Sequence, residues 1–175
     1  MNVGTDGARP IVVRSTRGRN VRVQRLHNWK LSPRKAIEIQ RTLRDRVSKA
    51  RLRRKVRSVA GVDVGIRGCD ATAEVVVLSF PGLEVQEVRV VRRPVSFPYV
   101  PGLLSFCELL VISKAFSRLR LEPDLALVDG HGIAHSRRLG IASHLGLLLD
   151  CPTVGFAKLR LCGEARRARA GERVP

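Results

Sequence analysis

PDLALVDGHGIAHSRRLGIASHLGLLLDCPTVGFAKLRLCG, residues 123–163, is the stretch that decides the fold expected for this chain. It opens with an apolar strand that ends at Asp129, continues through a Gly-rich turn and a helix, and closes with a second apolar strand that ends at Lys158. A carboxylate at the mouth of a buried strand is costly to keep ionised unless a metal ion, a basic side chain or backbone donors lie beside it. The stretch therefore predicts an active site where these strands end.

A second carboxylate interrupts another apolar strand. Residues 58–66 read SVAGVDVGI, a pattern typical of a buried central strand, and Asp63 stands within it. Asp is disfavoured in strands and is rarely buried alone. Two such strands favour an arrangement in which the strands are adjacent in the sheet and their Asp side chains share a divalent cation. The alternative is a capping Asp at one strand end and a buried salt bridge at the other.

The order of elements predicts an α/β fold in a single domain without internal repeats. We expect strands at 58–66, 72–80, 83–91, 125–128 and 153–157, and helices at about 33–56, 104–121 and 137–149. Three early strands in a meander, followed by strands that alternate with helices, give a mixed sheet flanked by helices. Ribonuclease H-like folds have this order, and their central strands carry carboxylates that bind divalent metal.

Charge indicates a nucleic-acid partner. The 175-residue chain has 33 Lys and Arg against 15 Asp and Glu, a formal net charge of +18. Residues 1–57 hold 18 of these basic residues and 3 of the acidic ones, a net charge of +15. We interpret residues 1–25 as a mobile basic arm, for which a merely solvated tail is the alternative. Composition alone also fits an RNA-binding protein of the ribosomal kind.

The sequence does not favour a membrane protein or a secreted protein. No stretch reaches the roughly 18 apolar residues of a membrane span, and the N-terminus lacks the pattern of a signal peptide. We expect free thiols and a cytoplasmic location, because the spacing of the cysteines suits neither a zinc site nor a disulfide framework. The cysteines are Cys69, Cys107, Cys151 and Cys162.

Several motifs, in order and spacing, carry a family resemblance. They are GVDVG (61–65), FPYVPGLLSFCE (97–108), VDGHGIAH (128–135) and GFAK (155–158). Taken together, they make the chain resemble endonuclease V, the deoxyinosine-directed repair nuclease. The resemblance implies a DNA repair enzyme that hydrolyses a phosphodiester bond on the 3′ side of deoxyinosine and leaves 3′-hydroxyl and 5′-phosphate ends. It also implies Mg²⁺, with Mn²⁺ possible, and inosine-containing DNA or RNA as the partner of a monomer.

The same resemblance implies residue roles. Asp63, Asp129 and Glu108 match the metal-ligating and catalytic carboxylates. Tyr99, between Pro98 and Pro101, matches the wedge that opens the duplex. The remaining matches are Gly130 and Gly132 beside the base pocket, and His135 and Lys158 near the scissile phosphate and the recognised nucleotide. Structural alternatives are a Tyr packed in a turn, an exposed helical Glu and a His that caps a turn. We expect His131 and His144 to be structural.

The chain also departs from the family pattern. Cys107 stands where the family usually has Arg, directly before the third carboxylate. The resemblance covers residues 31–163, so we expect a basic arm over 1–25, an incomplete catalytic domain over 26–163 and an Arg-rich tail over 164–175. A family segment with a helix and an assisting His would follow, and the expectation is a C-terminally truncated copy. Alternatives in function are a catalytically impaired nucleic-acid-binding remnant and an inosine-specific endoribonuclease.

Overall fold

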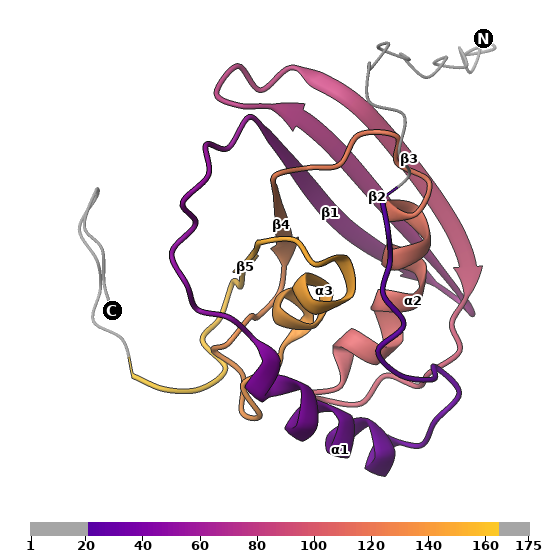
Figure 1. Ribbon diagram of the computed structural model, residues 1–175. Coiled ribbons are helices and arrows are strands. Elements are labelled where there is room, and N and C mark those ends of the chain that lie inside the picture. Colours follow the sequence, from indigo (N-terminus) through magenta and orange to yellow (C-terminus); the bar gives the residue numbers. More distant parts are fainter. Residues whose placement is uncertain (1–20, 165–175) are drawn as a thin grey trace, which may run out of the picture.

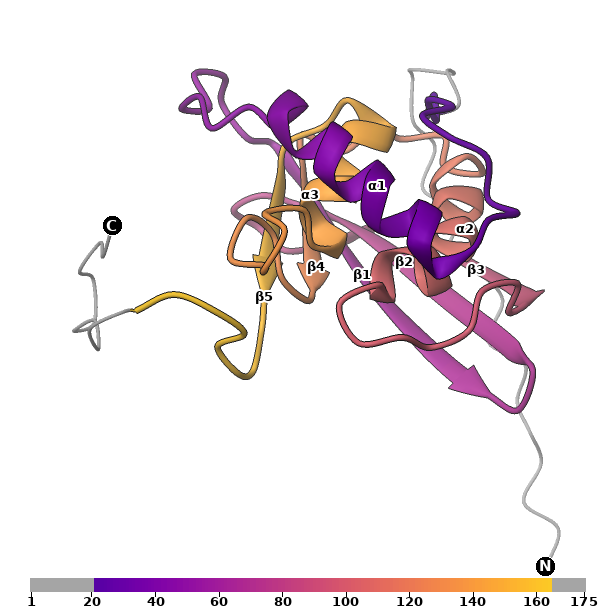
Figure 2. The ribbon, with the colours of Figure 1, turned by 90° about the horizontal axis from the view of Figure 1, so that it is seen from below.

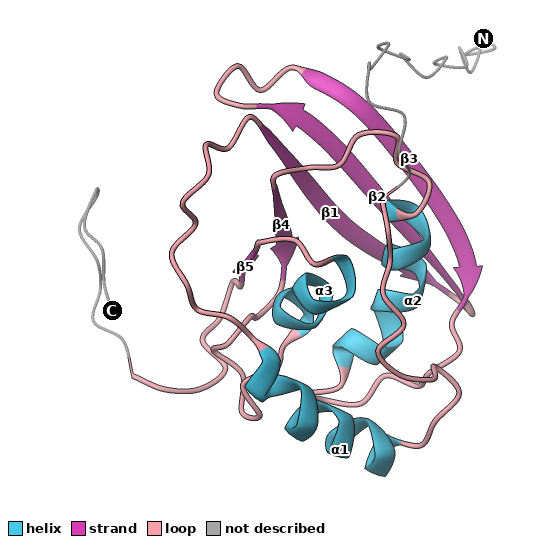
Figure 3. Ribbon diagram, in the orientation of Figure 1, coloured by secondary structure: helices cyan, strands magenta, loops and turns pink. Residues whose placement is uncertain are grey.

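The computed structural model describes residues 21–164 and forms one five-stranded sheet in the order β3-β2-β1-β4-β5 (Figures 1 and 3). The strands are β1 (Ser58–Arg67), β2 (Asp70–Ser79), β3 (Val85–Pro94), β4 (Leu125–Asp129) and β5 (Thr153–Phe156). The first three pair antiparallel, whereas β4 runs parallel to β1 and β5 runs parallel to β4. This is the mixed sheet that the sequence predicts, with β1 at its centre.

The helices lie together on one face of the sheet, as the two perpendicular views show (Figures 1 and 2). They are α1 (Pro33–Leu43), a short 3-10 turn η1 (Arg44–Arg46), α2 (Leu104–Phe116) and α3 (Ile141–Leu149). Ala126 and Val128 of β4 are buried in the core cluster with residues of α2 and α3. Leu125 and Leu127 point the other way and are only half-buried, so the helix-covered face carries the core.

The first helix is shorter than the sequence predicts. It begins as expected, with the Ser32 hydroxyl accepting from the Lys35 N–H at 3.3 Å and Pro33 in the first turn. It ends at Leu43, however, and not near residue 56; residues 47–57 are neither helix nor strand. Eight basic residues stand between 44 and 57, and a helix would stack several of them at repulsive i, i+4 spacing.

The other two helices also differ from their expected bounds. The last residues of the expected 104–121 helix fall in a turn, because α2 ends at Phe116. The third helix begins at 141, not 137, since Arg138 has a positive φ of 58° that an α-helix cannot contain. Residues 130–140 therefore form a turn at the carboxyl end of β4, close to the predicted active site.

The boundary expected for the basic arm lies too far along the chain. Val21 is buried against the core, and the Gln24 N–H donates to the Leu148 carbonyl at 2.7 Å. Residues 21–25 thus belong to the folded body. The rest of the predicted arm and nearly all of the predicted Arg-rich tail lie outside the described residues.

All four cysteines are free. Among residues 21–164, no helix is both long and apolar enough to cross a membrane.

A pair of imidazoles, of which His144 is buried and His27 half-buried, joins the N-terminal segment to α3. His27 Nε2 lies 2.9 Å from His144 Nε2, so one of the two nitrogens must be unprotonated to accept the bond. His144 is fully buried beside Trp29 and Phe106. Burial, and then the nearby His27, lowers the pKa of His144 to about 3. Burial also lowers the pKa of His27.

This pair predicts acid sensitivity of the fold. The unfolded chain takes up a proton near pH 6.5 while folded His144 stays neutral. The contribution of His144 to stability is therefore fully present above pH 6.5 and is lost as the pH drops towards 3, by at most about 1.4 kcal/mol per pH unit. In urea unfolding at a series of pH values, the stability of the wild type relative to His144→Leu should fall with this slope as the pH drops. The His131→Gln variant keeps the imidazole pair and should keep the slope; equal slopes in all three proteins would contradict the assignment.

Candidate active site

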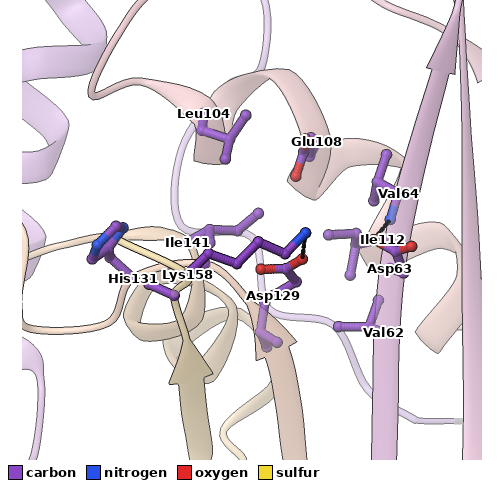
Figure 4. Close-up of a pocket in the computed structure, with 13 residues that line it drawn as sticks. Val62, Asp63, Val64, Leu104, Glu108, Ile112, Asp129, His131, Ile141 and Lys158 are labelled. Atoms are coloured by element: carbon purple, nitrogen blue, oxygen red, sulfur yellow. Dashed lines mark hydrogen bonds and ion pairs between the residues drawn. The ribbon is translucent and has the colours of Figure 1, made fainter. Parts of the chain in front are cut away.

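The three sequence-predicted carboxylates line one cleft of about 310 Å³ at the carboxyl end of β4 (Figure 4). The parallel register of β1 and β4 pairs Val62 with Val128, so Asp63 and Asp129 follow at neighbouring positions on adjacent strands. Glu108 reaches the cleft from α2. The expectation that the two apolar strands are neighbours is met.

Helical spacing explains how α2 presents Glu108. Leu104, Glu108 and Ile112 are four residues apart and all line the cleft, so they share one face of α2. Leu104 and Ile112 surround the carboxyl group with apolar atoms. Burial, and then the negative charges of Asp63 and Asp129, raise the pKa of Glu108 to about 7. At neutral pH this carboxyl therefore shares the site with a proton or with a cation.

The oxygen donors of the cleft suit a hard divalent cation. Carboxylate oxygens are the ligands that Mg²⁺ and Mn²⁺ prefer, and Mg²⁺ commonly takes only one or two direct carboxylates and keeps several waters. A cation would also relieve the charge repulsion that raises the pKa of Glu108. The donor set therefore fits Mg²⁺ or Mn²⁺.

The side chains of the cleft are not arranged as a complete set of three metal ligands. Within residues 21–164, no three His, Cys, Asp or Glu side chains are arranged to hold one metal ion, so the expected tight convergence is not met. The two aspartates have local partners: Asp63 Oδ1 accepts from the Val64 N–H at 2.8 Å, and Asp129 Oδ2 lies 3.7 Å from Lys158 Nζ.

Lys158 emerges where the sequence predicts, two residues beyond β5 and at the same edge as Asp129 (Figure 4). Its side chain is 89% exposed, which leaves the ammonium group accessible to an anion entering the cleft. The ion pair with Asp129 is therefore weak and open to exchange.

His131 is a cleft residue that the sequence interpretation missed. It lines the cleft, and its Nε2 lies 2.9 Å from the Leu159 carbonyl oxygen, which ties the turn after β4 to the segment after β5. A signal was present in the sequence. His131 comes two residues after the end of β4, the position from which parallel strands usually present functional side chains.

His135 does not occupy the place expected for it. Its ring is buried, its Nε2 lies 3.1 Å from the Gly102 carbonyl oxygen, and its Nδ1 accepts from the Arg137 N–H at 3.1 Å. It is not among the residues that line the cleft. The turn folds His135 inward beneath the loop at residues 98–102, outside the cleft, and its contact with phosphate stays a prediction.

The carbonyl oxygen of Gly102 is the anchor of that loop. Gln40 Nε2 donates to it at 3.0 Å and Arg137 Nη2 at 2.7 Å, beside the contact from His135. This network fixes the end of the proline-flanked loop. Tyr99 remains 70% exposed at its tip, with Pro98 and Pro101 also exposed. A packed turn tyrosine, the structural alternative, is thereby ruled out.

The glycines after β4 allow close packing. Gly130 lines the cleft with a positive φ of 137°, and a Cβ there would come within 2.5 Å of the Ile141 side chain. Gly132 is not a lining residue; a Cβ there would meet the Ser143 hydroxyl at 3.4 Å. Of the two glycines expected at the base pocket, only Gly130 borders the cleft.

The family model for endonuclease V matches residues 41–174. The chain belongs to the endonuclease V family. The match extends beyond residue 163, where the sequence resemblance was expected to end. Endonuclease V from Gloeobacter violaceus is 51% identical over 144 residues, which cover 80% of this chain and 58% of that protein. The Nostoc punctiforme endonuclease V is 50% identical over 141 residues, covering 79% and 64% of the two chains.

Solved endonuclease V structures share the fold. The Streptomyces avermitilis protein superposes with a TM-score of 0.76 at 36% identity, over 87% of this chain and 68% of that one. Ciona intestinalis endonuclease V, solved with a 24mer DNA that contains an inosine followed by a ribo-adenosine, gives 0.66 at 32% identity, over 71% and 57%. The sheet described above is therefore the ribonuclease H-like sheet of the endonuclease V family.

The chain spans roughly three fifths of the length of these curated endonuclease V relatives, 58% and 64% in the two cases given.

Cys107, the departure noted beside the third carboxylate, is buried in α2. Burial, and then the adjacent Glu108, raises the pKa of its thiol. A neutral thiol cannot supply the positive charge of the Arg that the family resemblance implies at this position.

Proposed function

We propose that the chain is a divalent-metal-dependent endonuclease that acts on DNA containing deoxyinosine and hydrolyses a phosphodiester bond on its 3′ side. The observation that carries this proposal is the cleft in which Asp63, Glu108 and Asp129 come from three elements, with the pKa of Glu108 raised to about 7. Membership of the endonuclease V family supports the substrate class.

Different residues of the cleft have different roles in the proposed reaction. Asp63, Asp129 and Glu108 would hold the cation, Mg²⁺ or Mn²⁺. Once bound, such a cation polarises a phosphoryl oxygen and lowers the pKa of a coordinated water. Lys158 would offset the charge of the entering phosphate, because its ammonium is exposed beside Asp129. His131 would orient the turn at the cleft through its contact with the Leu159 carbonyl.

Tyr99 is proposed as the side chain that enters the duplex beside the lesion. It is exposed on a loop whose prolines and Gly102 anchor limit its motion, so inserting it costs little conformational entropy. Unstacking a base costs a few kcal/mol, and least where the pair is mismatched or damaged.

The Tyr99→Ala variant should lose roughly tenfold or more in affinity for an inosine-containing duplex and under threefold for an undamaged duplex, since base–aromatic stacking contributes about 1–3 kcal/mol. Fluorescence anisotropy on both duplexes measures the difference. Tyr99→Phe keeps the ring and serves as the control. Equal losses on the two duplexes would refute the wedge role.

The decisive experiment for the function uses an end-labelled duplex with one inosine, incubated with the full chain in Mg²⁺ or in EDTA. We expect Mg²⁺-dependent cleavage 3′ to the inosine, products with 3′-hydroxyl and 5′-phosphate ends, and no cleavage of the adenine-containing control. Binding without cleavage would instead support the nucleic-acid-binding remnant. Faster cleavage of an inosine-containing RNA of the same sequence would support the endoribonuclease.

A further inference from the structure

Residues 44–57, which we name the basic strap, connect α1 to β1 and carry the densest charge of the described chain. The strap contains eight basic residues and one acidic residue, Asp45. All eight basic residues are exposed: Arg44, Arg46, Lys49, Arg51, Arg53, Arg54, Lys55 and Arg57. Six of them are Arg, whose planar guanidinium binds phosphate oxygens in pairs.

Most of this charge has no acidic partner within the described part of the chain. Two ion pairs form there, Arg44 with Asp45 at 3.4 Å and Arg54 with Asp124 at 3.9 Å, and both are long and partly exposed. The other six basic side chains of the strap make no ion pair within residues 21–164. Such a concentration of like charge repels itself and destabilises the fold until an external polyanion neutralises it.

The strap is held to the folded body at its carboxyl end. The Arg57 N–H donates to Asp124 Oδ2 at 2.8 Å, and the Arg57 carbonyl accepts from the Phe80 N–H at 2.8 Å. Arg54 Nη2 donates to the Asp124 carbonyl at 2.9 Å. These contacts fix the carboxyl-terminal part of the strap against the folded body, which sets the strap apart from a free basic tail.

The strap ends where β1 begins, beside the amino-terminal end of β4, whereas the cleft lies at the carboxyl end of β4. Asp124, its contact, directly precedes β4, whereas Asp129 of the cleft is the last residue of β4. The five residue steps from Asp124 to Asp129 span about 16 Å along a strand. Both ribbon views place the strap on the β5 side of the molecule, away from β3 (Figures 1 and 2). A duplex rises about 3.4 Å per base pair, so a ligand that touches both places extends roughly five base pairs beyond the cleft.

We propose that the basic strap is a second nucleic-acid contact, which grips the phosphate backbone several base pairs away from the bond in the cleft. This proposal rests on the proposed function, because the cleft must hold the same nucleic acid. The strap favours phosphate backbone over a lipid surface. Leu52 is its one exposed large apolar residue, and the strap contains no aromatic residue to enter a bilayer.

The test compares two triple variants of the full chain with equal charge loss. One neutralises the strap at positions outside its ion pairs, Lys49→Gln, Arg51→Gln and Arg53→Gln. The control neutralises exposed residues of β3 and of the α2 region, Arg93→Gln, Lys114→Gln and Arg118→Gln. Each removes two Arg and one Lys. Binding to a 24-base-pair duplex, with or without inosine, is measured over 50–200 mM salt.

The strap variant should lower the slope of log K against log[salt] by about 2–3, because three phosphate contacts contribute roughly 0.9 each. Its affinity should fall at least about tenfold on both duplexes, and the control should change less than about twofold. On a short duplex with the inosine at its centre and three base pairs on either side, each arm extends only about 10 Å from the cleft and does not reach the strap, so the two variants should bind alike.

Equal slopes for the strap and control variants would overturn the proposal. So would a loss of binding to phosphatidylserine vesicles as large as the loss on DNA, since the strap would then be a general polyanion surface. Cleavage is scored separately on the same duplexes. If the strap variant changes the salt slope but the wild type shows no Mg²⁺-dependent cleavage, the strap proposal is supported and the proposed function is refuted. If the wild type cleaves but the strap variant leaves the salt slope unchanged, the proposed function is supported and the strap proposal is refuted.

Discussion

Replacing Asp63 or Asp129 by Asn is expected to reduce cleavage of an inosine-containing duplex by a factor on the order of a thousand, with binding changed less than about threefold. A cation held by these carboxylates would contribute several kcal/mol of charge stabilisation, and each 1.36 kcal/mol of barrier is a factor of ten in rate. Both carboxylates line the cleft, whereas the basic strap proposed to contact the phosphate backbone lies outside it. Single-turnover rates with saturating protein separate the two effects.

Asp70→Asn is the matched control. Asp70 is also in the sheet, where it pairs with Arg92 at 2.7 Å on β3, but it does not line the cleft. This variant should cleave at the wild-type rate. If Asp63→Asn and Asp129→Asn lose binding in parallel with cleavage, the claim that these carboxylates serve cleavage while other residues provide the affinity for nucleic acid is wrong.

Gly155→Ala is expected to destabilise the fold by about 3 kcal/mol and to reduce cleavage sharply. A Cβ at position 155 would collide with the Gly130 carbonyl oxygen and would lie 2.9 Å from the Gly132 nitrogen, both of them backbone atoms of the turn that borders the cleft. Backbone cannot rotate away as a flexible side chain can, so the turn must shift. Thermal unfolding should show a melting temperature lower by roughly 6–12 °C.

Gly61→Ala in β1 is the control for this substitution. A Cβ at position 61 meets no atom within 4 Å, so the same added methyl group should leave the melting temperature within about 2 °C or raise it slightly. A Gly155→Ala protein as stable as Gly61→Ala would show that the turn has more space than this packing indicates.

The sheet and its two aspartates could be predicted because their signal is local. Apolar strands with one misplaced Asp each are rare, and a parallel pair brings such residues to one edge. The position of Glu108 came from a motif, and the four-residue spacing with Leu104 and Ile112 explains it afterwards. Lys158 followed from its place after β5.

The remaining features depend on contacts between distant segments. His135 is buried because Gly102, 33 residues away, offers it a carbonyl oxygen, and no local pattern reports that contact. The strap has apolar residues at helical spacing, yet its charge keeps it out of a helix after Leu43. The expectation for residues 21–25 failed for a similar reason, since Val21 and Gln24 find partners in the body of the fold.

The central claim is that Asp63, Glu108 and Asp129 form one metal centre, and Mn²⁺ located by anomalous scattering in crystals of the chain tests it most directly. We expect a strong peak in the cleft, with carboxylate oxygens of Asp63 and Asp129 at roughly 2.1–2.3 Å and Glu108 within reach of the ion directly or through a water. The peak should vanish in Asp63→Asn crystals. Mn²⁺ bound elsewhere, or retained in the cleft after that substitution, would contradict the account.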